Sequence, residues 1–269
     1  MEQLQTKTIT VNGIRLSYTD SGVNAQPVVF IHGFPFNKSS WLPQIGGLGK
    51  TYRSLAIDLR GYGDSEAGTD NFSIDLFASD LLQFVEALKL DSPVLCGLSM
   101  GGYIAMNAVN RSPEKFKALV LADTQCIADS EEGKEKRFKT IEKIESEGLQ
   151  TFADGFVQNV FNKNSLEAKK QAVDDVRKMI TGTKKETVTK TLKALAERKE
   201  TCTGIKKLKL PALIICGKDD NVTPLSQSEL LNNSIVGSKL QIIENAGHLS
   251  NLEQPEEFNK VLTDFLGTL

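Results

Sequence analysis

The chain of 269 residues lacks two features that would each indicate a particular class of protein. It has no uninterrupted apolar run of about 18 residues, so no segment is expected to span a bilayer. It also has no basic excess, because 32 Lys and Arg stand against 34 Asp and Glu, whereas proteins that bind nucleic acid neutralise phosphates with a positive surplus. We therefore predict a globular protein with no membrane and no nucleic acid as partner. Its oligomeric state is not readable from the sequence.

Histidine and cysteine are scarce as well. The four cysteines are Cys96, Cys126, Cys202 and Cys216. They are far apart and form no close pair of the zinc or redox type, so we expect buried, reduced thiols. With only His32 and His248 available, a zinc site would need scattered carboxylates or thiols, so neither a metal nor a cofactor is predicted. The first residues show no basic segment followed by an apolar stretch, which favours a cytoplasmic location.

Short β-rich runs alternate with helical patterns along most of the chain. Eight strands are expected at 7–11, 15–20, 28–31, 54–57, 94–98, 118–122, 212–216 and 240–243. Asn12-Gly13 separates the first two, and this dipeptide is a strong hairpin signal, so the sheet should open with an antiparallel pair. The later strands alternate with helices, which predicts an α/β fold with a doubly wound, mostly parallel, eight-stranded sheet.

The alternation stops between the sixth and seventh expected strands. Residues 125–209 have helical patterns and are predicted to form an inserted helical cap, while 1–124 and 210–269 form the core. From 125 to 210 the chain carries 19 Lys and Arg against 14 Asp and Glu, a surplus of five positive charges that either attracts anionic substrates or is only a solvated face. The apolar stripe with Phe152, Phe156 and Val160 either lines a substrate pocket or packs against neighbouring protein.

One segment, GLSMG at 97–101, has the pattern of a nucleophile elbow. An apolar strand precedes it and a helical pattern follows it, which is the context in which a serine sits on a sharp, strained turn. The glycines allow neighbouring backbone to pass where a Cβ would clash. Ser99 is therefore the candidate nucleophile, and the amide of Met100, at the start of the next helix, is a candidate oxyanion donor.

A serine hydroxyl needs a base and the base needs an acid. His248 follows the last expected strand, where a loop can reach Ser99, so it is the candidate base. The acid could be Asp219 or Asp220, after the seventh strand, or Asp123, after the sixth.

The other histidine, His32, lies at the end of an early strand. The tight turn that follows can direct the amide of Phe34 at the same cleft, as a second oxyanion donor. Nearby, Trp41 either walls the pocket for the acyl group or packs in the core.

Five motifs together resemble those of the α/β-hydrolase superfamily, over almost the whole length of the chain. They are HGFP at 32–35, DLRGYGDS at 58–65, GLSMGG at 97–102, GKDDNVTP at 217–224 and AGH at 246–248. The spacing of Asp220 from Gly217 and Pro224 matches the family pattern, so the resemblance selects Asp220 as the acid. The elbow and the segment AGHLSNLEQP are similar to the branch of small esterases, 3-oxoadipate enol-lactonase-like enzymes and cofactor-free haloperoxidases.

The resemblance implies a serine hydrolase that cleaves small carboxylic esters or lactones with Ser99, His248 and Asp220. Three alternatives remain open: a cofactor-free perhydrolase or haloperoxidase, a carbon–carbon bond hydrolase, and a ligand receptor or signalling switch that keeps the triad. A dianionic lactone would need cationic residues in the pocket, for which the cap offers Arg137, Arg177 and Arg198.

Overall fold

A single eight-stranded sheet forms the centre of the computed structural model, which describes residues 4–269, and its strand order is β1-β2-β4-β3-β5-β6-β7-β8. The strands are β1 (Gln5–Val11), β2 (Ile14–Asp20), β3 (Pro27–Ile31), β4 (Arg53–Ile57), β5 (Val94–Leu98), β6 (Ala118–Ala122), β7 (Ala212–Gly217) and β8 (Lys239–Ile243). The predicted fold is confirmed, since every expected strand is present with bounds that differ by at most two residues at either end.

The expected hairpin opens the sheet. Val11 of β1 pairs with Ile14 of β2, so the loop consists of Asn12 and Gly13, and both have positive φ angles, 46° and 74°. Positive φ at both loop positions is what a tight hairpin turn with the right-handed strand twist requires. Strand β2 runs antiparallel to β1 and to β4, and the other neighbouring strands are parallel.

Helices cover both faces of the sheet. Strands β3, β4, β5, β6 and β7 send alternate apolar side chains into two separate core clusters. Helices α2 (Ile74–Ala87), α3 (Met100–Arg111) and α9 (Leu225–Ser234) contribute to one cluster, and α1 (Leu42–Leu48) and α11 (Pro255–Leu266) to the other. Short elements complete this part: η1 (Lys38–Trp41), η2 (Pro113–Lys115), α8 (Cys202–Ile205) and α10 (Ser250–Glu253). Within 4–269, no helix combines the length and the apolar character needed to cross a membrane.

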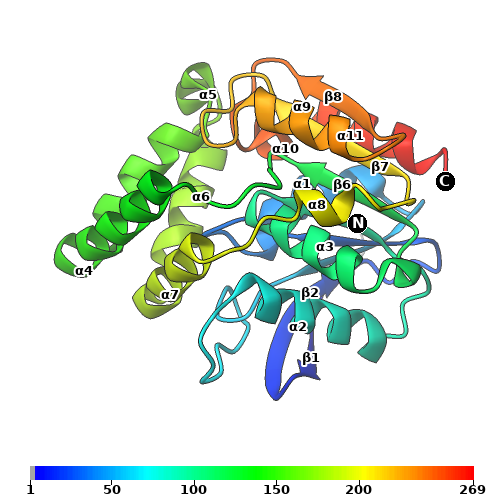
Figure 1. Ribbon diagram of the computed structural model, residues 1–269, viewed down its shortest axis with the longest axis horizontal. Helices are drawn as coiled ribbons and strands as arrows, with labels where there is room; N and C mark the ends of the chain where they lie inside the picture. Colours follow the sequence, from blue (N-terminus) through cyan, green and yellow to red (C-terminus); the bar gives the residue numbers. More distant parts are fainter. Residues whose placement is uncertain (1–3) are drawn as a thin grey trace.

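Between β6 and β7 the chain leaves the sheet and forms a separate group of helices. These are α4 (Glu131–Val160), α5 (Lys163–Ala168), α6 (Lys170–Thr181) and α7 (Lys185–Ala196). In Figure 1 they lie together, in green to yellow-green, beside the sheet rather than over either of its faces. Helix α4 is kinked at Gly148, where φ is 85°. This group lies within the predicted cap and borders the sheet edge where the parallel strands end.

The prediction of four reduced thiols was wrong for two of them. Cys126, just after β6, forms a disulfide with Cys202, which begins α8 before β7, and the two positions are 76 residues apart in the chain. The bond forms because β6 and β7 are neighbours in the sheet, so the first and last residues of the inserted helices return to the same place. Sequence spacing does not reveal this proximity. Cys96 and Cys216 are free and buried, as expected.

Candidate active site

Ser99 lies on a strained turn between β5 and α3. Its φ of 51° and ψ of −114° are outside the regions that a residue with a side chain favours. A Cβ on Gly97 would come within 2.4 Å of the Gly101 carbonyl oxygen, and one on Gly101 within 2.1 Å of the Ile31 carbonyl oxygen. Both positions therefore require glycine, and the turn presents Ser99 at the carboxyl edge of the sheet.

A chain of hydrogen bonds runs from Ser99 through His248 to Asp220. The Oγ of Ser99 is 2.8 Å from Nε2 of His248, and Nδ1 of His248 is 2.8 Å from Oδ2 of Asp220. All three residues are less than 10% exposed, with Ser99 the most accessible at 8%. The three expected side chains, separated by up to 149 residues in the sequence, thus meet with the geometry of a nucleophile, a base and an orienting acid.

Asp220, and not its neighbour Asp219, faces the histidine. Its Oδ1 accepts the backbone N–H groups of Val222 and Thr223, at 2.7 and 2.9 Å, and its Oδ2 accepts the Thr223 hydroxyl at 2.8 Å. These bonds hold the carboxylate in one orientation toward His248. Asp219 is exposed and accepts a hydrogen bond from the amide of Asn162 instead.

Asp220 and His248 each stabilise the charged form of the other. Burial by itself lowers the pKa of His248, but the neighbouring Asp220 charge and hydrogen bond raise it, and the resulting pKa lies above the ordinary histidine value. Burial likewise raises the pKa of Asp220, while the attraction and hydrogen bond of His248 outweigh that effect and hold the pKa below its usual value. Asp220 is therefore ionised at neutral pH and stabilises a positive charge on His248.

The two candidate oxyanion donors lie beside Ser99. Phe34, on the loop after β3, and Met100, the first residue of α3, line the same cavity as Ser99 and His248. The N–H of Met100 is among the first of its helix, which have no intrahelical acceptor. His32 holds this loop, since its Nε2 accepts the N–H of Leu59 at 3.0 Å, and burial lowers its pKa to about 4, so it stays neutral.

A cavity of about 320 Å³ opens at Ser99, between the sheet edge and the helices α4 and α7. Its apolar lining consists of Phe34, Met100, Phe152, Phe156, Leu192, Leu195 and Val222. Besides Ser99 and His248, its polar lining includes Tyr103, Asp129, Lys136, Arg137 and Thr140. Phe152 and Phe156, from α4, pack against Phe34 with ring centroids 6.2 and 6.1 Å away and the rings inclined by 52° and 82°, so the aromatic side of the cavity joins α4 to the loop after β3.

Two expected substrate-binding residues lie elsewhere. Trp41 is fully buried between Phe30 and Phe258, with ring centroids 4.9 and 6.0 Å away, and is not among the residues that line the cavity. Val160 is also fully buried, and its carbonyl oxygen accepts the backbone N–H of His248 at 2.8 Å. Trp41 thus packs in the core, while Val160 supports the histidine loop through its backbone.

The arginines proposed for an anionic substrate are engaged within the protein. Asp129 forms ion pairs with two arginines. One is Arg137, which lines the cavity, and the other is Arg198, whose Nη1 is 2.7 Å from Oδ1 of Asp129. The guanidinium of Arg198 also lies over the ring of Tyr103, 4.6 Å from its centroid. Arg177 pairs with Asp154 of α4 and Asp174 of α6 and does not line the cavity. Sequence spacing missed Asp129, because only the packing of the helices between β6 and β7 brings it close to both arginines.

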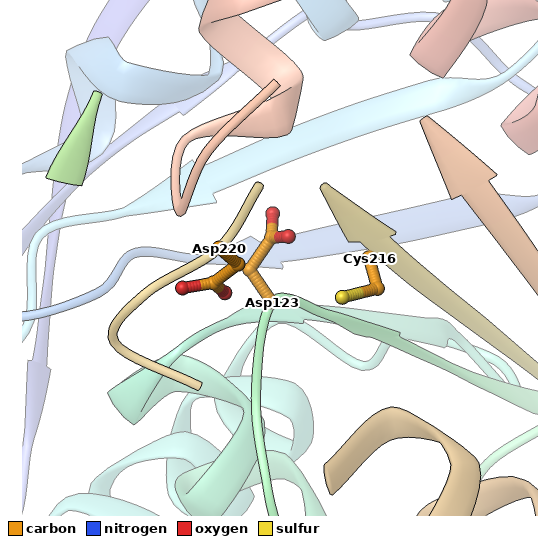
Figure 2. A group of neighbouring side chains, drawn as sticks. All are labelled: Asp123, Cys216 and Asp220. Carbon is orange, nitrogen blue, oxygen red and sulfur yellow. The ribbon is translucent and has the colours of Figure 1, made fainter. Parts of the chain in front are cut away.

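Among residues 4–269, one group of side chains is close enough together to bind a metal ion. It consists of Asp123, Cys216 and Asp220, whose possible ligand atoms lie within 4.8 Å of one another (Figure 2). The oxygens of Asp220 already accept hydrogen bonds from Thr223 and face His248. Those of Asp123 are hydrogen-bonded to the Gly217 N–H and to the Ser250 hydroxyl. A metal ion here would have to displace these bonds, so the cluster is better explained as part of the support of the triad.

Comparisons with known proteins agree with this architecture. The chain is 26% identical to 3-oxoadipate enol-lactonase 2 of Acinetobacter baylyi, over 94% of this chain and 93% of that protein. Its structure superposes on that of a thermophilic esterase from Thermogutta terrifontis with a TM-score of 0.92 and 29% identity, covering 98% of each chain. The enol-lactonase from Burkholderia xenovorans gives a TM-score of 0.90 and 28% identity, over 97% of this chain and all of that one. The family model for the alpha/beta hydrolase fold matches residues 26–255, and the chain therefore belongs to the alpha/beta hydrolase family.

Proposed function

We propose that the protein is a serine hydrolase that cleaves small carboxylic esters or lactones through an acyl-enzyme. The observation that carries this proposal is the hydrogen-bonded chain of Ser99, His248 and Asp220 at the floor of a cavity. The named activities of the similar proteins, an esterase and two enol-lactonases, support the same reaction class.

In the proposed reaction, Ser99 attacks the carbonyl carbon of the substrate while Nε2 of His248 takes the hydroxyl proton. The amides of Phe34 and Met100 donate hydrogen bonds to the oxyanion, and Asp220 stabilises the imidazolium. His248 then protonates the leaving alcohol, which leaves the acyl group on Ser99. A water molecule, activated by the same histidine, hydrolyses this ester and restores the enzyme.

The cavity favours a small, neutral acyl group. Its volume of about 320 Å³ is near the lower end for ligand sites, and the side formed by Phe34, Phe152 and Phe156 is aromatic. The basic residues at the cavity have partners: Arg137 binds Asp129, and Lys136 binds Glu132 at 2.8 Å. An anionic substrate would have to compete with these carboxylates, so we expect a preference for neutral esters over dianionic lactones.

Hydrolysis of p-nitrophenyl acetate and butyrate by wild-type and Ser99→Ala protein tests the reaction. We expect sustained release of p-nitrophenol that the substitution reduces by several orders of magnitude, as expected when a covalent nucleophile is lost. Near wild-type activity in Ser99→Ala would refute the role of Ser99. One equivalent of product followed by a stall would instead favour the receptor or switch, and a faster reaction with hydrogen peroxide than with water would favour the perhydrolase.

The monoanionic p-nitrophenyl hydrogen succinate tests the substrate class when compared with p-nitrophenyl butyrate, a neutral ester with an acyl chain of the same length. We expect a higher kcat/KM for the butyrate. The opposite preference would mean that Lys136 and Arg137 exchange their internal partners for the substrate. A small ester or lactone is thus the proposed partner, and a cytoplasmic location stays a prediction.

A further inference from the structure

A second buried carboxyl group, Asp123, lies beside the triad and has no part in the reaction described above. It follows β6 directly, is fully buried, and lies next to Asp220, which follows β7 (Figure 2). Its Oδ1 accepts the Gly217 N–H at 2.7 Å, and its Oδ2 is 2.5 Å from the Ser250 hydroxyl oxygen. Gly217 is three residues before Asp220, and Ser250 is two residues after His248. Asp123 therefore connects the two loops that carry the acid and the base.

The surroundings of Asp123 disfavour its ionised form, because the carboxylate of Asp220 is already close by. Two carboxyl groups whose oxygens lie within 4.8 Å of each other repel when both are ionised. Asp220 has the imidazole of His248, a hydroxyl and two backbone N–H groups to stabilise its charge. Within 4–269, no lysine or arginine side chain forms an ion pair or hydrogen bond with Asp123. A single imidazolium on His248 can compensate only one of the two charges.

We propose that Asp123 is a positioning residue that acts as a neutral carboxylic acid, tying β7 and α10 to β6 without placing a second negative charge beside Asp220. In this form Oδ1 accepts the N–H of Gly217, and the protonated Oδ2 donates to the Ser250 hydroxyl while a lone pair of Oδ2 accepts the Ser250 N–H at 3.3 Å. Only the expected effect of Asp123 on catalysis depends on the proposed hydrolase function. The protonation state itself is a property of the fold.

The surrounding titratable groups agree with this assignment. Burial, and then the charge of Asp220, raise the pKa of Asp123 to about 8, against smaller opposing effects of His248 and of hydrogen bonds. On the adjacent strand, burial raises the pKa of the Cys216 thiol to about 12, so that group is neutral as well. Glu253, on α10, is buried, and its charge acts on His248.

The replacement Asp123→Asn distinguishes the two protonation states without an activity assay. An asparagine matches the protonated acid at two of its three contacts, because its amide oxygen can accept from Gly217 and its NH₂ can donate to the Ser250 hydroxyl. Only the backbone N–H of Ser250, which is 3.3 Å from Oδ2 in the wild type, loses its acceptor. In the wild type, the unfolded chain releases the Asp123 proton above about pH 4 while the folded chain keeps it. Wild-type stability is therefore lost as pH rises between these two pKa values, and the variant does not show this loss.

The first readout is thermal unfolding of both proteins between pH 5 and pH 9. We expect the melting temperature of Asp123→Asn, relative to wild type, to rise by on the order of 3 °C per pH unit up to about pH 8 and then to level off. A difference that stays constant from pH 5 to pH 8 would show that Asp123 is already ionised, and the proposal would be overturned. This readout is independent of whether the protein hydrolyses esters.

The second readout is catalytic and separates positioning from a purely structural role. At pH 7 we expect Asp123→Asn to keep kcat/KM within about threefold of wild type, and Asp123→Ala to lose about tenfold or more, mainly in kcat. Above pH 8 the asparagine variant should retain more of its activity than the wild type. A large loss in Asp123→Asn at pH 7, or full activity in a folded Asp123→Ala, would refute the positioning role.

Discussion

Adjacent aspartates at the end of β7 provide a matched pair of substitutions for the proposed triad. Asp220→Asn keeps the size of the side chain and removes its charge. Its amide oxygen can still accept the N–H groups that Oδ1 accepts now, at 2.7 and 2.9 Å, which places the NH₂ group opposite Nδ1 of His248. Since that NH₂ group is a donor, the histidine must carry its proton on Nε2, and it can then no longer accept the proton of Ser99.

The expected loss follows from this change of tautomer. Proton abstraction then requires the rare tautomer, and the imidazolium that forms lacks the stabilising carboxylate charge. Together these losses cost a factor of about 10³ to 10⁴ in kcat, or about 4 to 5.5 kcal/mol of barrier. Asp219→Asn removes an exposed carboxylate bound to Asn162 and should change kcat less than about threefold.

The assay compares steady-state hydrolysis of p-nitrophenyl butyrate by both variants and wild type, after circular dichroism has shown that all are folded. Equal losses at the two positions would refute the assignment of the acid. A loss below tenfold in Asp220→Asn would show that His248 does not depend on this carboxylate for its orientation.

Three further predictions concern pH, the elbow and the disulfide. Because the base must be neutral and the pKa of His248 is raised, kcat/KM should increase with pH through a midpoint above about 6.5, and a midpoint below that value in a pH-rate profile would contradict this effect of Asp220. Gly101→Ala should yield little folded, active protein, since its Cβ would lie 2.1 Å from a carbonyl oxygen, whereas Gly155→Ala, which meets no atom within 4 Å, should fold and melt at or above the wild-type temperature. Replacing Cys126 and Cys202 by serine should lower the free energy of unfolding by about 2–4 kcal/mol, measured by urea denaturation, and an unchanged midpoint would show that the bond adds no stability.

Much of the architecture could be predicted because its signals are local in the chain. Alternating apolar strands and helical patterns define the sheet, and Asn12-Gly13 defines its first turn, since few other residues adopt positive φ at both positions. The candidate triad could be chosen because parallel strands end at the same edge, which brings the loops carrying Ser99 and His248 together. Selecting Asp220 over Asp219 depended on the family resemblance, and the hydrogen bonds now supply a physical reason.

Other features depend on contacts between residues that are distant in sequence and show no local pattern. Cys126 and Cys202 meet only because β6 and β7 are neighbours, and Trp41 lies in the core because α1 and α11 close over it. Asp123 could be weighed as an alternative acid, but its link to Gly217 and Ser250 exists only when three elements converge. Local patterns determine which elements form and in what order, because they depend on backbone conformation and apolar periodicity. Which side chains meet between those elements depends on the packing of the whole chain.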